Sequence, residues 1–587
     1  MAAAVSVKRF DRAYFWLVVP FVAALISIGR VWPVLPAVMQ DEYVYSMEAR
    51  FTPFALQLYP NYLFSWLYSG TSGCGAGFYQ CGKSLNVLFF FATLAFIFLI
   101  ARRLFSVTWS AWIATFAAFS PIHVYVSYFM PEAMYFAFIT ATIYLALVAG
   151  AKHKLSWWIA TGVLLGLSAL VKPHALFTLP AFLLFALLVA LRSEGGGWGK
   201  GLVAALGKLG AFAAVKFGLG FAFAGAAGLS LFGSSYSATF NQFVNESAGR
   251  AGSGSTDVIA QTVANVQVAG EQVSSAAAGA AAGQSSGLGF FGVMIPHSFA
   301  HLALLITVAA FPLLLSVSVV KDAVVKKQEV SAASQFLILI GLLSVSFAVV
   351  IASFEGLVTT LGDDHSYRIL TRYYEFMVPL LLIAAAAFGK FVEPKIKWRA
   401  VQSAIVIAAL IFAWVYLSGV KQSFADSILL SGYLSGPAVI PIVCVVGVLV
   451  ALIWIFSANN GSKIIVHVVT PLIILIAGFS SQSYLLTQVG TQPAYFDIAG
   501  QKAKPLLADV PGNKISIVGP VRYQNFTTKF WIDKPGIDDV TLPDGMTLDE
   551  KVVSDMDYVV LIGNSKINGS NQVLDQGQGY AIVKLNH

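Results

Sequence analysis

The sequence predicts a polytopic α-helical membrane protein with about 13 transmembrane helices and a small C-terminal α/β domain. Hydrophobic residues make up 58% of the 587 residues and charged residues only 11%, whereas an ordinary soluble domain carries roughly 25% charged residues. The mean hydropathy is +0.77. Long apolar runs recur up to residue 484, and the composition changes after it. These observations exclude a soluble globular protein.

The apolar runs give the predicted spans, since a helix needs ~20 mostly apolar residues to cross a bilayer. The first run is interpreted as a retained helix, because no small-residue cleavage site follows it. Lys208 and Lys216 make the start of the seventh run ambiguous, and Pro296 and His297 leave a re-entrant or interfacial start of the eighth run as an alternative. The predicted spans are 14–36, 85–101, 108–126, 132–150, 156–171, 175–192, 211–232, 289–319, 334–354, 373–392, 400–419, 437–457 and 464–484.

The charges predict which side each loop occupies. The net charge of +8 comes from basic residues at the ends of apolar runs, as the positive-inside rule expects, and no nucleic-acid partner is predicted. If the N-terminus is cytoplasmic, every predicted cytoplasmic turn is basic, and the opposite loops carry acids. An odd number of spans then places the C-terminal tail outside the cell. The pattern favours a multi-pass protein of a bacterial plasma membrane.

Two domains are predicted, a transmembrane domain at 1–484 and an extracytoplasmic domain at 485–587. The tail contains three short apolar segments, NKISIVGPV, MDYVVLIGN and GYAIVKLNH, which Gly, Asp and Pro separate. Such segments are typical of buried strands. A small α/β or α+β domain is therefore expected.

Two external segments have their own composition. Residues 233–288 are rich in Ala, Ser and Gly, so they form either a loop that orders over a substrate or a plain disordered connector. Cys74 and Cys81 lie in the first external loop. An oxidising compartment favours a disulfide between them, and two free thiols are the alternative.

Three acids stand where spans meet the outer surface. Asp41 and Glu42 follow the first span, and Glu132 opens the fourth after Pro131. Acids at the C-terminal end of a helix oppose its dipole, so Asp41 and Glu42 are interpreted as functional rather than as a simple helix end. Glu132 has an alternative as a first-turn acid that complements the dipole.

Basic residues are predicted to gather on the same side. Lys172 and His174 occupy a short outer turn, where Lys172 has snorkelling to the interface as an alternative. Arg368 and Arg372 are four residues apart and share a face if that segment is helical. Two guanidinium groups suit a phosphate. The alternative is ion pairing of these arginines with Asp364 or Glu375, which could coexist with phosphate binding.

The combination predicts acid–base chemistry on a lipid-linked phosphate. A partly buried carboxylate can act as a general base, and nearby cations would stabilise a phosphate leaving group. An external site has no nucleotide sugar available, whereas a polyprenyl-phosphate sugar reaches it with its tail in the lipid. Asp41 would then deprotonate an acceptor hydroxyl that attacks the anomeric carbon.

Three short motifs resemble the GT-C superfamily of polyprenyl-phosphate-sugar-dependent membrane glycosyltransferases. DEYVY is similar to the DE motif in the first outer loop of its protein O-mannosyltransferase and aminoarabinose transferase branch, which implies that Asp41 is the base. SYFMPEAM is similar to the second acidic position and points to Glu132. LTRYYEFMVP resembles a late outer-loop motif and points to Arg372 and Tyr373.

The resemblance also carries implications for substrates and cofactors. It implies an inverting hexosyl- or pentosyltransferase that uses a polyprenyl-phosphate donor and a cell-envelope glycan, lipid or protein acceptor. The sugar does not carry over, because the DE pair here runs into Tyr-Val-Tyr. No cofactor is implied as essential, although some members bind a divalent ion, to which Glu42, Asp363 or His365 could contribute. The alternatives are a transporter and a lipid-linked-glycan polymerase or ligase.

Overall fold

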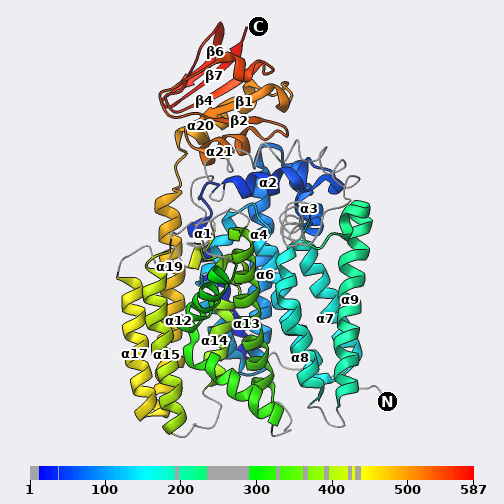
Figure 1. Ribbon diagram of the computed structural model, residues 1–587, viewed down its shortest axis with the longest axis vertical. Helices are drawn as coiled ribbons and strands as arrows, with labels where there is room; N and C mark the ends of the chain where they lie inside the picture. Colours follow the sequence, from blue (N-terminus) through cyan, green and yellow to red (C-terminus); the bar gives the residue numbers. More distant parts are fainter. Residues whose placement is uncertain are drawn as a thin grey trace, which may run out of the picture.

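The molecule is a bundle of long helices with a small mixed domain at one end (Figure 1). The structure is a computed structural model. It confirms the predicted fold class. Ten helical stretches within the described part of the chain are long and apolar enough to cross a membrane, and three shorter apolar helices accompany them. The structure describes residues 12–36, 39–191, 197–233, 290–325, 331–360, 368–388, 396–420, 426–429 and 438–586.

Every predicted apolar run contains a helix, although a count of thirteen membrane crossings stays a prediction. The helices of the bundle are α1 (Val18–Val31), α4 (Phe78–Arg102), α5 (Val107–Ala118), α6 (Glu132–Lys152), α7 (Leu155–Val171), α8 (Leu179–Leu191), α9 (Trp198–Ala224), α12 (Phe290–Val325), α13 (Ala332–Thr360), α14 (Met377–Phe388), α15 (Ile396–Leu417), α17 (Val439–Phe456), α18 (Ala458–Ile464) and α19 (Thr470–Gln488).

The first run differs from its predicted bounds of 14–36. Helix α1 ends at Val31, and the next helix, α2 (Met39–Arg50), is separate from it. The buried Lys83 ammonium donates to the carbonyl oxygens of Trp32 at 2.9 Å and of Val34 at 2.5 Å, and cations are favourable at helix C-termini. Lys83 therefore fixes the point where the chain leaves α1 and turns towards α2.

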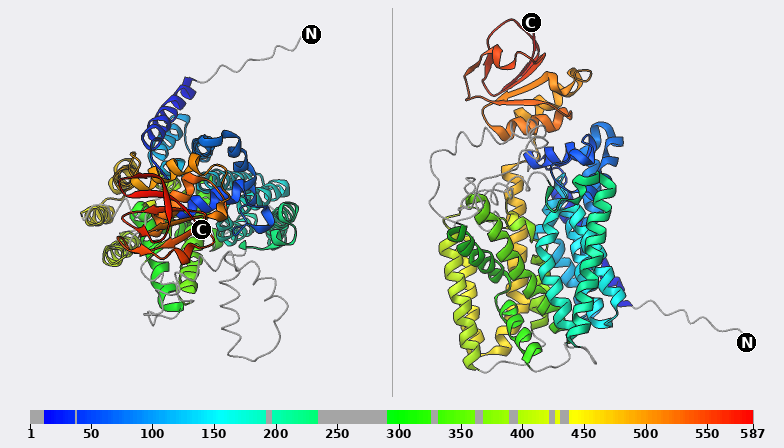
Figure 2. Two further views of the ribbon diagram at one scale, coloured as in Figure 1. Left: turned by 90° about the horizontal axis from the view of Figure 1, so that it is seen from above. Right: turned by 45° about the vertical axis from the view of Figure 1, so that its right-hand side comes forward.

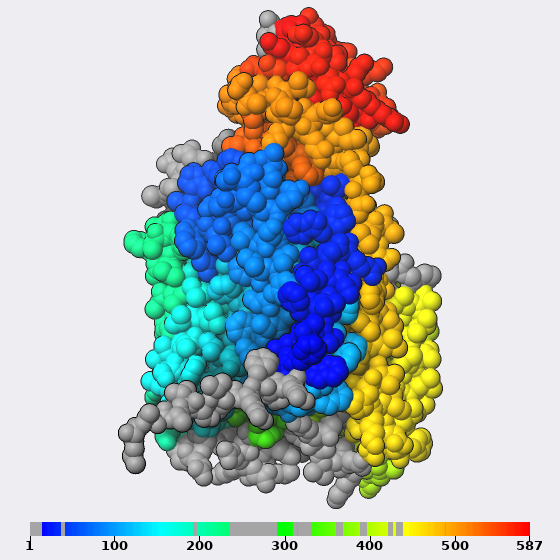
Figure 3. Space-filling view, turned by 180° about the vertical axis from the view of Figure 1, so that it is seen from behind, coloured from blue at the N-terminus to red at the C-terminus, as the bar shows by residue number. Residues whose placement is uncertain are grey.

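A layer of short helices covers the end of the bundle that faces the C-terminal domain (Figure 1). It contains α2, α3 (Tyr62–Tyr68) and the 3₁₀ segment Ser69–Gly77. A disulfide joins Cys74 and Cys81 at the start of α4. In the view from behind, α1 runs along the surface of the bundle towards this layer (Figure 3).

Two ambiguous runs are continuous helices. Helix α9 begins at Trp198 and contains both Lys208 and Lys216, which are buried. The eighth run forms the single helix α12, without a re-entrant piece at Pro296 and His297. The predicted loop at 233–288 lies outside the described residues beyond Gly233.

The C-terminal domain contains a five-stranded sheet, a two-stranded sheet formed by β3 and β5, and two α-helices. The strand order of the five-stranded sheet is β2-β1-β4-β7-β6, in which β1 is parallel to β2 and β4, and β7 is antiparallel to β4 and β6. The three predicted apolar segments contain β1, β4 and β7. The elements are α20 (Tyr495–Leu506), β1 (Ile515–Gly519), α21 (Arg522–Ile532), β2 (Asp538–Thr541), β3 (Thr547–Leu548), β4 (Tyr558–Ile562), β5 (Lys566–Ile567), β6 (Asn571–Gly577) and β7 (Tyr580–Leu585).

Helix α21 connects the two cores. Ile532 belongs to the core of the C-terminal domain, whereas Phe530 packs in the large buried cluster of the helical bundle. Figure 2 shows α20 and α21 between the sheet and the bundle. The domain is therefore seated on the bundle through buried side chains.

Candidate active site

Asp41 and Glu42 lie in the first turn of α2. The expectation that they end the first span is therefore wrong, and so is the argument that they oppose a helix dipole, because acids in a first turn complement it. The two side chains differ in environment. Glu42 is fully buried and accepts a hydrogen bond from the Phe129 backbone N–H at 2.8 Å, whereas the Asp41 side chain is 32% exposed. Asp41 is the acid that a substrate could reach.

Four charged side chains, one of them Asp41, come from four distant segments and meet at one place. Arg372 Nη2 lies 2.8 Å from Asp41 Oδ2, and Arg372 Nε lies 3.7 Å from Glu132 Oε1. Lys172 forms an ion pair with the same Glu132 oxygen. The fully buried Lys172 does not snorkel to the surface. Asp41, Arg372, Glu132 and Lys172 are called the charged cluster below.

Helix starts and turns place these groups. Glu132 is the first residue of α6 after Pro131. Lys172 follows the last residue of α7 in extended conformation, just before Pro173, and the residue before a proline is disfavoured in helices. Arg372 lies in the 3₁₀ turn Thr371–Tyr373. The prolines thus help to place both Glu132 and Lys172 at helix ends.

An aromatic wall adjoins the charged cluster. The His174 ring stacks on Tyr373 with centroids 3.8 Å apart and planes 15° apart. The Lys172 ammonium lies 5.0 Å from the centre of the Tyr373 ring, and the Arg372 guanidinium lies 5.6 Å from it. Six of the predicted side chains therefore occupy one region: Asp41, Glu132, Lys172, His174, Arg372 and Tyr373.

Arg368 does not join the charged cluster. The segment from Arg368 to Leu370 is not helical, so the two arginines do not share a helix face. Arg368 binds Asp426 through Nε at 2.9 Å and Nη2 at 2.7 Å. Glu375 bonds instead to Tyr125, Thr371 and Leu429, and Asp364 lies outside the described residues. Asp426 was missed by the sequence analysis, although a single acid beside the apolar stretch SILL is an indication.

Buried hydrogen bonds hold the turn that carries Arg372. Glu375 is fully buried and accepts from Tyr125 Oη at 2.9 Å, Thr371 Oγ1 at 2.7 Å and the Leu429 backbone N–H at 2.8 Å. The Arg372 backbone N–H donates to the Asp426 carbonyl oxygen at 3.2 Å. Residues 426–429 thus pack directly beneath the charged cluster.

The charged cluster holds two basic side chains beside two carboxylates. Burial lowers the pKa of Lys172 to about 8, although Glu132 opposes the shift. Burial also acts to lower the pKa of Arg372, but Asp41, Tyr373 and Glu132 raise it well above its ordinary value. A charged guanidinium with carboxylate neighbours can exchange one of them for a phosphate oxygen.

The structure does not support a metal site within the residues it describes. No group of three or more His, Cys, Asp or Glu side chains in those residues could hold a metal ion. The Glu42 carboxylate already accepts a hydrogen bond from the Phe129 backbone N–H. Asp363 and His365, which were predicted to contribute to a metal site, lie outside the described residues.

A known family model matches part of this site. Residues 83–216 match the family described as dolichyl-phosphate-mannose-protein mannosyltransferase. This match confirms the predicted resemblance. The matched segment runs from α4 to α9 and contains Glu132, Lys172 and His174, but neither Asp41 nor Arg372. No curated protein sequence gives a match.

This chain is also similar to the solved structures of two proteins. The archaeal oligosaccharyltransferase AglB from Archaeoglobus fulgidus, in complex with an inhibitory peptide and a dolichol-phosphate, is 12% identical with a TM-score of 0.46, covering 94% of this chain and 69% of that one. ArnT from Cupriavidus metallidurans, bound to undecaprenyl phosphate, is 13% identical with a TM-score of 0.43, covering 97% of each chain.

Proposed function

We propose that this protein is a membrane glycosyltransferase that moves a sugar from a polyprenyl-phosphate donor to an extracytoplasmic glycan, lipid or protein acceptor. The observation that carries the proposal is the charged cluster, in which Arg372 contacts both Asp41 and Glu132. The matched family description names a dolichyl-phosphate sugar donor, which is a polyprenyl phosphate. The proposal includes a bacterial plasma membrane, a cytoplasmic N-terminus, and a transmembrane domain and an extracytoplasmic domain divided at 484/485.

In this proposal Arg372 and Lys172 bind the donor phosphate. A phosphate oxygen would replace Asp41 as a partner of the Arg372 guanidinium, whose fork geometry suits phosphate oxygens. Lys172 would add a second positive charge from its place beside Glu132. Phosphate binding would thus release Asp41 from its ion pair at the moment when the donor is in place.

Asp41 would then act as the general base. The acceptor hydroxyl gives its proton to the Asp41 carboxylate while its oxygen forms a bond with the anomeric carbon. The bond between that carbon and the phosphate oxygen breaks on the opposite face, and polyprenyl phosphate leaves with the electron pair. A single displacement of this kind inverts the anomeric configuration. Arg372 and Lys172 would stabilise the leaving phosphate.

Removing the base and removing the phosphate ligand should have different effects. In Asp41→Asn we expect loss of transfer by at least about 100-fold, because a positioned base contributes typically 10²–10⁴-fold, with binding of undecaprenyl phosphate retained. In Arg372→Ala we expect binding to weaken by at least about tenfold, since a charge-assisted bond is lost. Binding is measured on the purified full chain, and transfer by mass spectrometry of envelope glycans from cells that carry each variant.

Asp557→Asn and Lys514→Ala are matched controls, since both side chains are exposed in the C-terminal domain. Both controls should behave as the wild type. Full transfer activity in Asp41→Asn would overturn the assignment of the base, and an unchanged affinity in Arg372→Ala would remove the phosphate role. Envelope glycans that do not change when the protein is absent would contradict the proposed activity as a whole.

A further inference from the structure

A second polar cluster lies within the helical bundle, beside the turn that carries Arg372. Its members are His297 and His301 on α12, Glu355 on α13, and Tyr374, and all four are essentially buried. His297 Nδ1 lies 2.6 Å and His301 Nε2 lies 3.2 Å from the same oxygen, Glu355 Oε2. His301 Nδ1 lies 2.8 Å from the Tyr374 hydroxyl. We call this group the histidine–glutamate cluster.

The hydrogen bonds of this cluster form a consistent chain. If His297 and His301 each donate a ring N–H to Glu355 Oε2, the second nitrogen of a neutral His301 is an acceptor. The Tyr374 hydroxyl then donates to His301 Nδ1. The two histidines are four residues apart on α12 and so lie on one face. Each group of the chain therefore fixes the orientation of the next.

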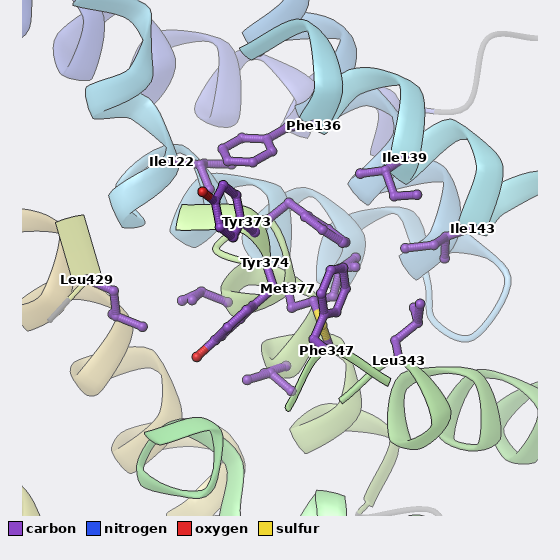
Figure 4. Close-up of a cluster of buried hydrophobic side chains, with 14 of the residues drawn as sticks. Ile122, Phe136, Ile139, Ile143, Leu343, Phe347, Tyr373, Tyr374, Met377 and Leu429 are labelled. Carbon is purple, nitrogen blue, oxygen red and sulfur yellow. The ribbon is translucent and has the colours of Figure 1, made fainter. Parts of the chain in front are cut away.

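Glu355 also binds the backbone of the Arg372 turn. Its second oxygen, Oε1, accepts the Leu370 backbone N–H at 2.9 Å. Leu370 and Tyr374, the two anchor points, stand two residues before and two residues after Arg372. Figure 4 shows Tyr373 and Tyr374 on opposite sides of this turn, with Tyr374 near Phe347 and Met377. The turn is thus held on either side of the arginine.

Placing a carboxylate and two imidazoles within apolar helices of a membrane protein carries a free-energy cost. None of the three touches Asp41, Glu132 or Lys172 among the contacts described. Their hydrogen bonds to Leu370 and Tyr374 instead connect them to the one short turn that carries Arg372. Glu375 holds the opposite side of that turn through Tyr125 and Leu429.

We propose that Glu355, with His297, His301 and Tyr374, positions Arg372 for binding of the donor phosphate. The cluster fixes the backbone from Leu370 to Tyr374, so that the Arg372 guanidinium points at Asp41 and Glu132 before any ligand arrives. This inference rests on the proposed function, since it assigns Arg372 to the phosphate. Glu355 is thus a positioning residue, and it does not touch the reacting atoms. A guanidinium that is fixed in advance loses less freedom on binding.

The test combines two variants with a matched control. Glu355→Gln keeps an oxygen that can accept the Leu370 N–H, but its amide donates where the imidazoles need an acceptor. Tyr374→Phe keeps the ring in its packing and removes only the bond to His301. Ser344→Ala is the control, because Ser344 is buried on the same helix and its hydroxyl donates to the Ile340 carbonyl oxygen of that helix.

Two measurements separate positioning from folding. Hydrogen exchange of the peptide that covers residues 368–376 reports the order of the turn. The affinity of the purified chain for undecaprenyl phosphate reports whether Arg372 is positioned to bind the phosphate. In Glu355→Gln and Tyr374→Phe we expect faster exchange in this peptide and about three- to tenfold weaker binding, the range that loss of one net hydrogen bond gives. In a transfer assay the donor KM should rise while kcat stays near the wild-type value.

The outcomes are distinct. Variants that remain folded, exchange as the wild type does and bind undecaprenyl phosphate with unchanged affinity would overturn the inference. An equal loss of binding in Ser344→Ala would also overturn it, because the effect would then be general to the helix. A wild-type chain that does not bind undecaprenyl phosphate would overturn the proposed function instead, and the exchange of residues 368–376 would then decide the structural claim alone.

Discussion

At the scale of the residue, Glu48 shows how burial changes the chemistry of one acid. Glu48 lies seven residues after Asp41 on α2, and its side chain is nearly fully buried. Its Oε1 accepts the backbone N–H groups of Leu58 at 2.6 Å and Tyr59 at 3.3 Å. Burial raises the pKa of Glu48 from 4.5 to about 8, against the lowering effect of these two bonds. Glu48 is therefore mostly protonated at neutral pH in the folded protein.

This raised pKa makes stability depend on pH. An acid whose pKa is higher in the folded state binds its proton more tightly there, so its stabilising effect is present below pH 4.5 and is lost as the pH rises towards 8. Glu48→Gln removes the titration. We expect the variant to gain on the wild type by up to about 4 kcal/mol between pH 5 and pH 8, because one pKa unit corresponds to about 1.4 kcal/mol.

Thermal unfolding of both proteins in detergent at pH 5 and pH 8 measures this difference. Asp557→Asn, which changes an exposed acid, should show the same pH dependence as the wild type. A difference between Glu48→Gln and wild type that is equal at the two pH values would show that Glu48 does not titrate between them.

At the scale of the element, α19 approaches the rest of the bundle through a glycine. A Cβ atom at Gly478 would overlap the backbone carbonyl oxygen of Phe119. The neighbouring Phe479 ring stacks on Phe119 with centroids 5.8 Å apart. One turn further on, Ser481 Oγ donates to the Ile428 carbonyl oxygen at 2.9 Å. Close packing at Gly478 thus places α19 where it supports residues 426–429 beneath the charged cluster.

Gly478→Ala should destabilise the protein by about 1–3 kcal/mol, since an added methyl group in a packed contact forces the helices apart. Gly218→Ala on α9 is the control, because a Cβ there meets no atom within 4 Å, and alanine favours the helix by up to about 1 kcal/mol. Thermal unfolding of both variants measures the effect. A Gly478→Ala protein as stable as Gly218→Ala would contradict the close contact.

At the scale of the whole molecule, one buried ion pair joins the C-terminal domain to the helix that carries Asp41. Arg50, at the end of α2, donates from Nη1 to Asp533 Oδ2 at 3.1 Å, and Lys504 Nζ donates to the same oxygen at 3.1 Å. The Arg50 guanidinium also lies 3.8 Å from the centre of the Phe78 ring. Asp533 has a left-handed backbone, with φ of 66°, directly after α21. Asp and Asn tolerate this conformation better than most residues.

Asp533→Asn should loosen this attachment, because it leaves Arg50 with its charge buried and unpaired while the left-handed backbone is kept. Breaking a buried pair on one side costs about 3–5 kcal/mol. Limited proteolysis of the linker between α19 and α20 should become faster. The double variant Arg50→Met with Asp533→Asn removes the buried, unpaired charge of Arg50. It should recover part of the lost resistance to proteolysis. Wild-type cleavage rates in Asp533→Asn would show that the pair does not hold the domain.

The sequence predicted which polar side chains gather in one region better than it predicted their surroundings. Asp41, Glu132, Lys172 and Arg372 were chosen as polar residues at span ends, and the structure brings them together. The end of the first helix was misjudged because hydropathy does not register the break at Pro33 and Pro36. Asp426 and Glu355 were missed, because an isolated acid near an apolar run has no periodicity that tells where it points.

The sequence by itself determined the membrane fold, the strand-rich C-terminal domain and the types of residue in the site, because hydrophobic periodicity and charge placement are local properties. Only the tertiary structure decided the partners: that Arg372 contacts Asp41 and Glu132 while Arg368 turns to Asp426. Such pairings depend on how helices separated by hundreds of residues pack, and the energy of that packing is a sum over contacts that no single segment contains.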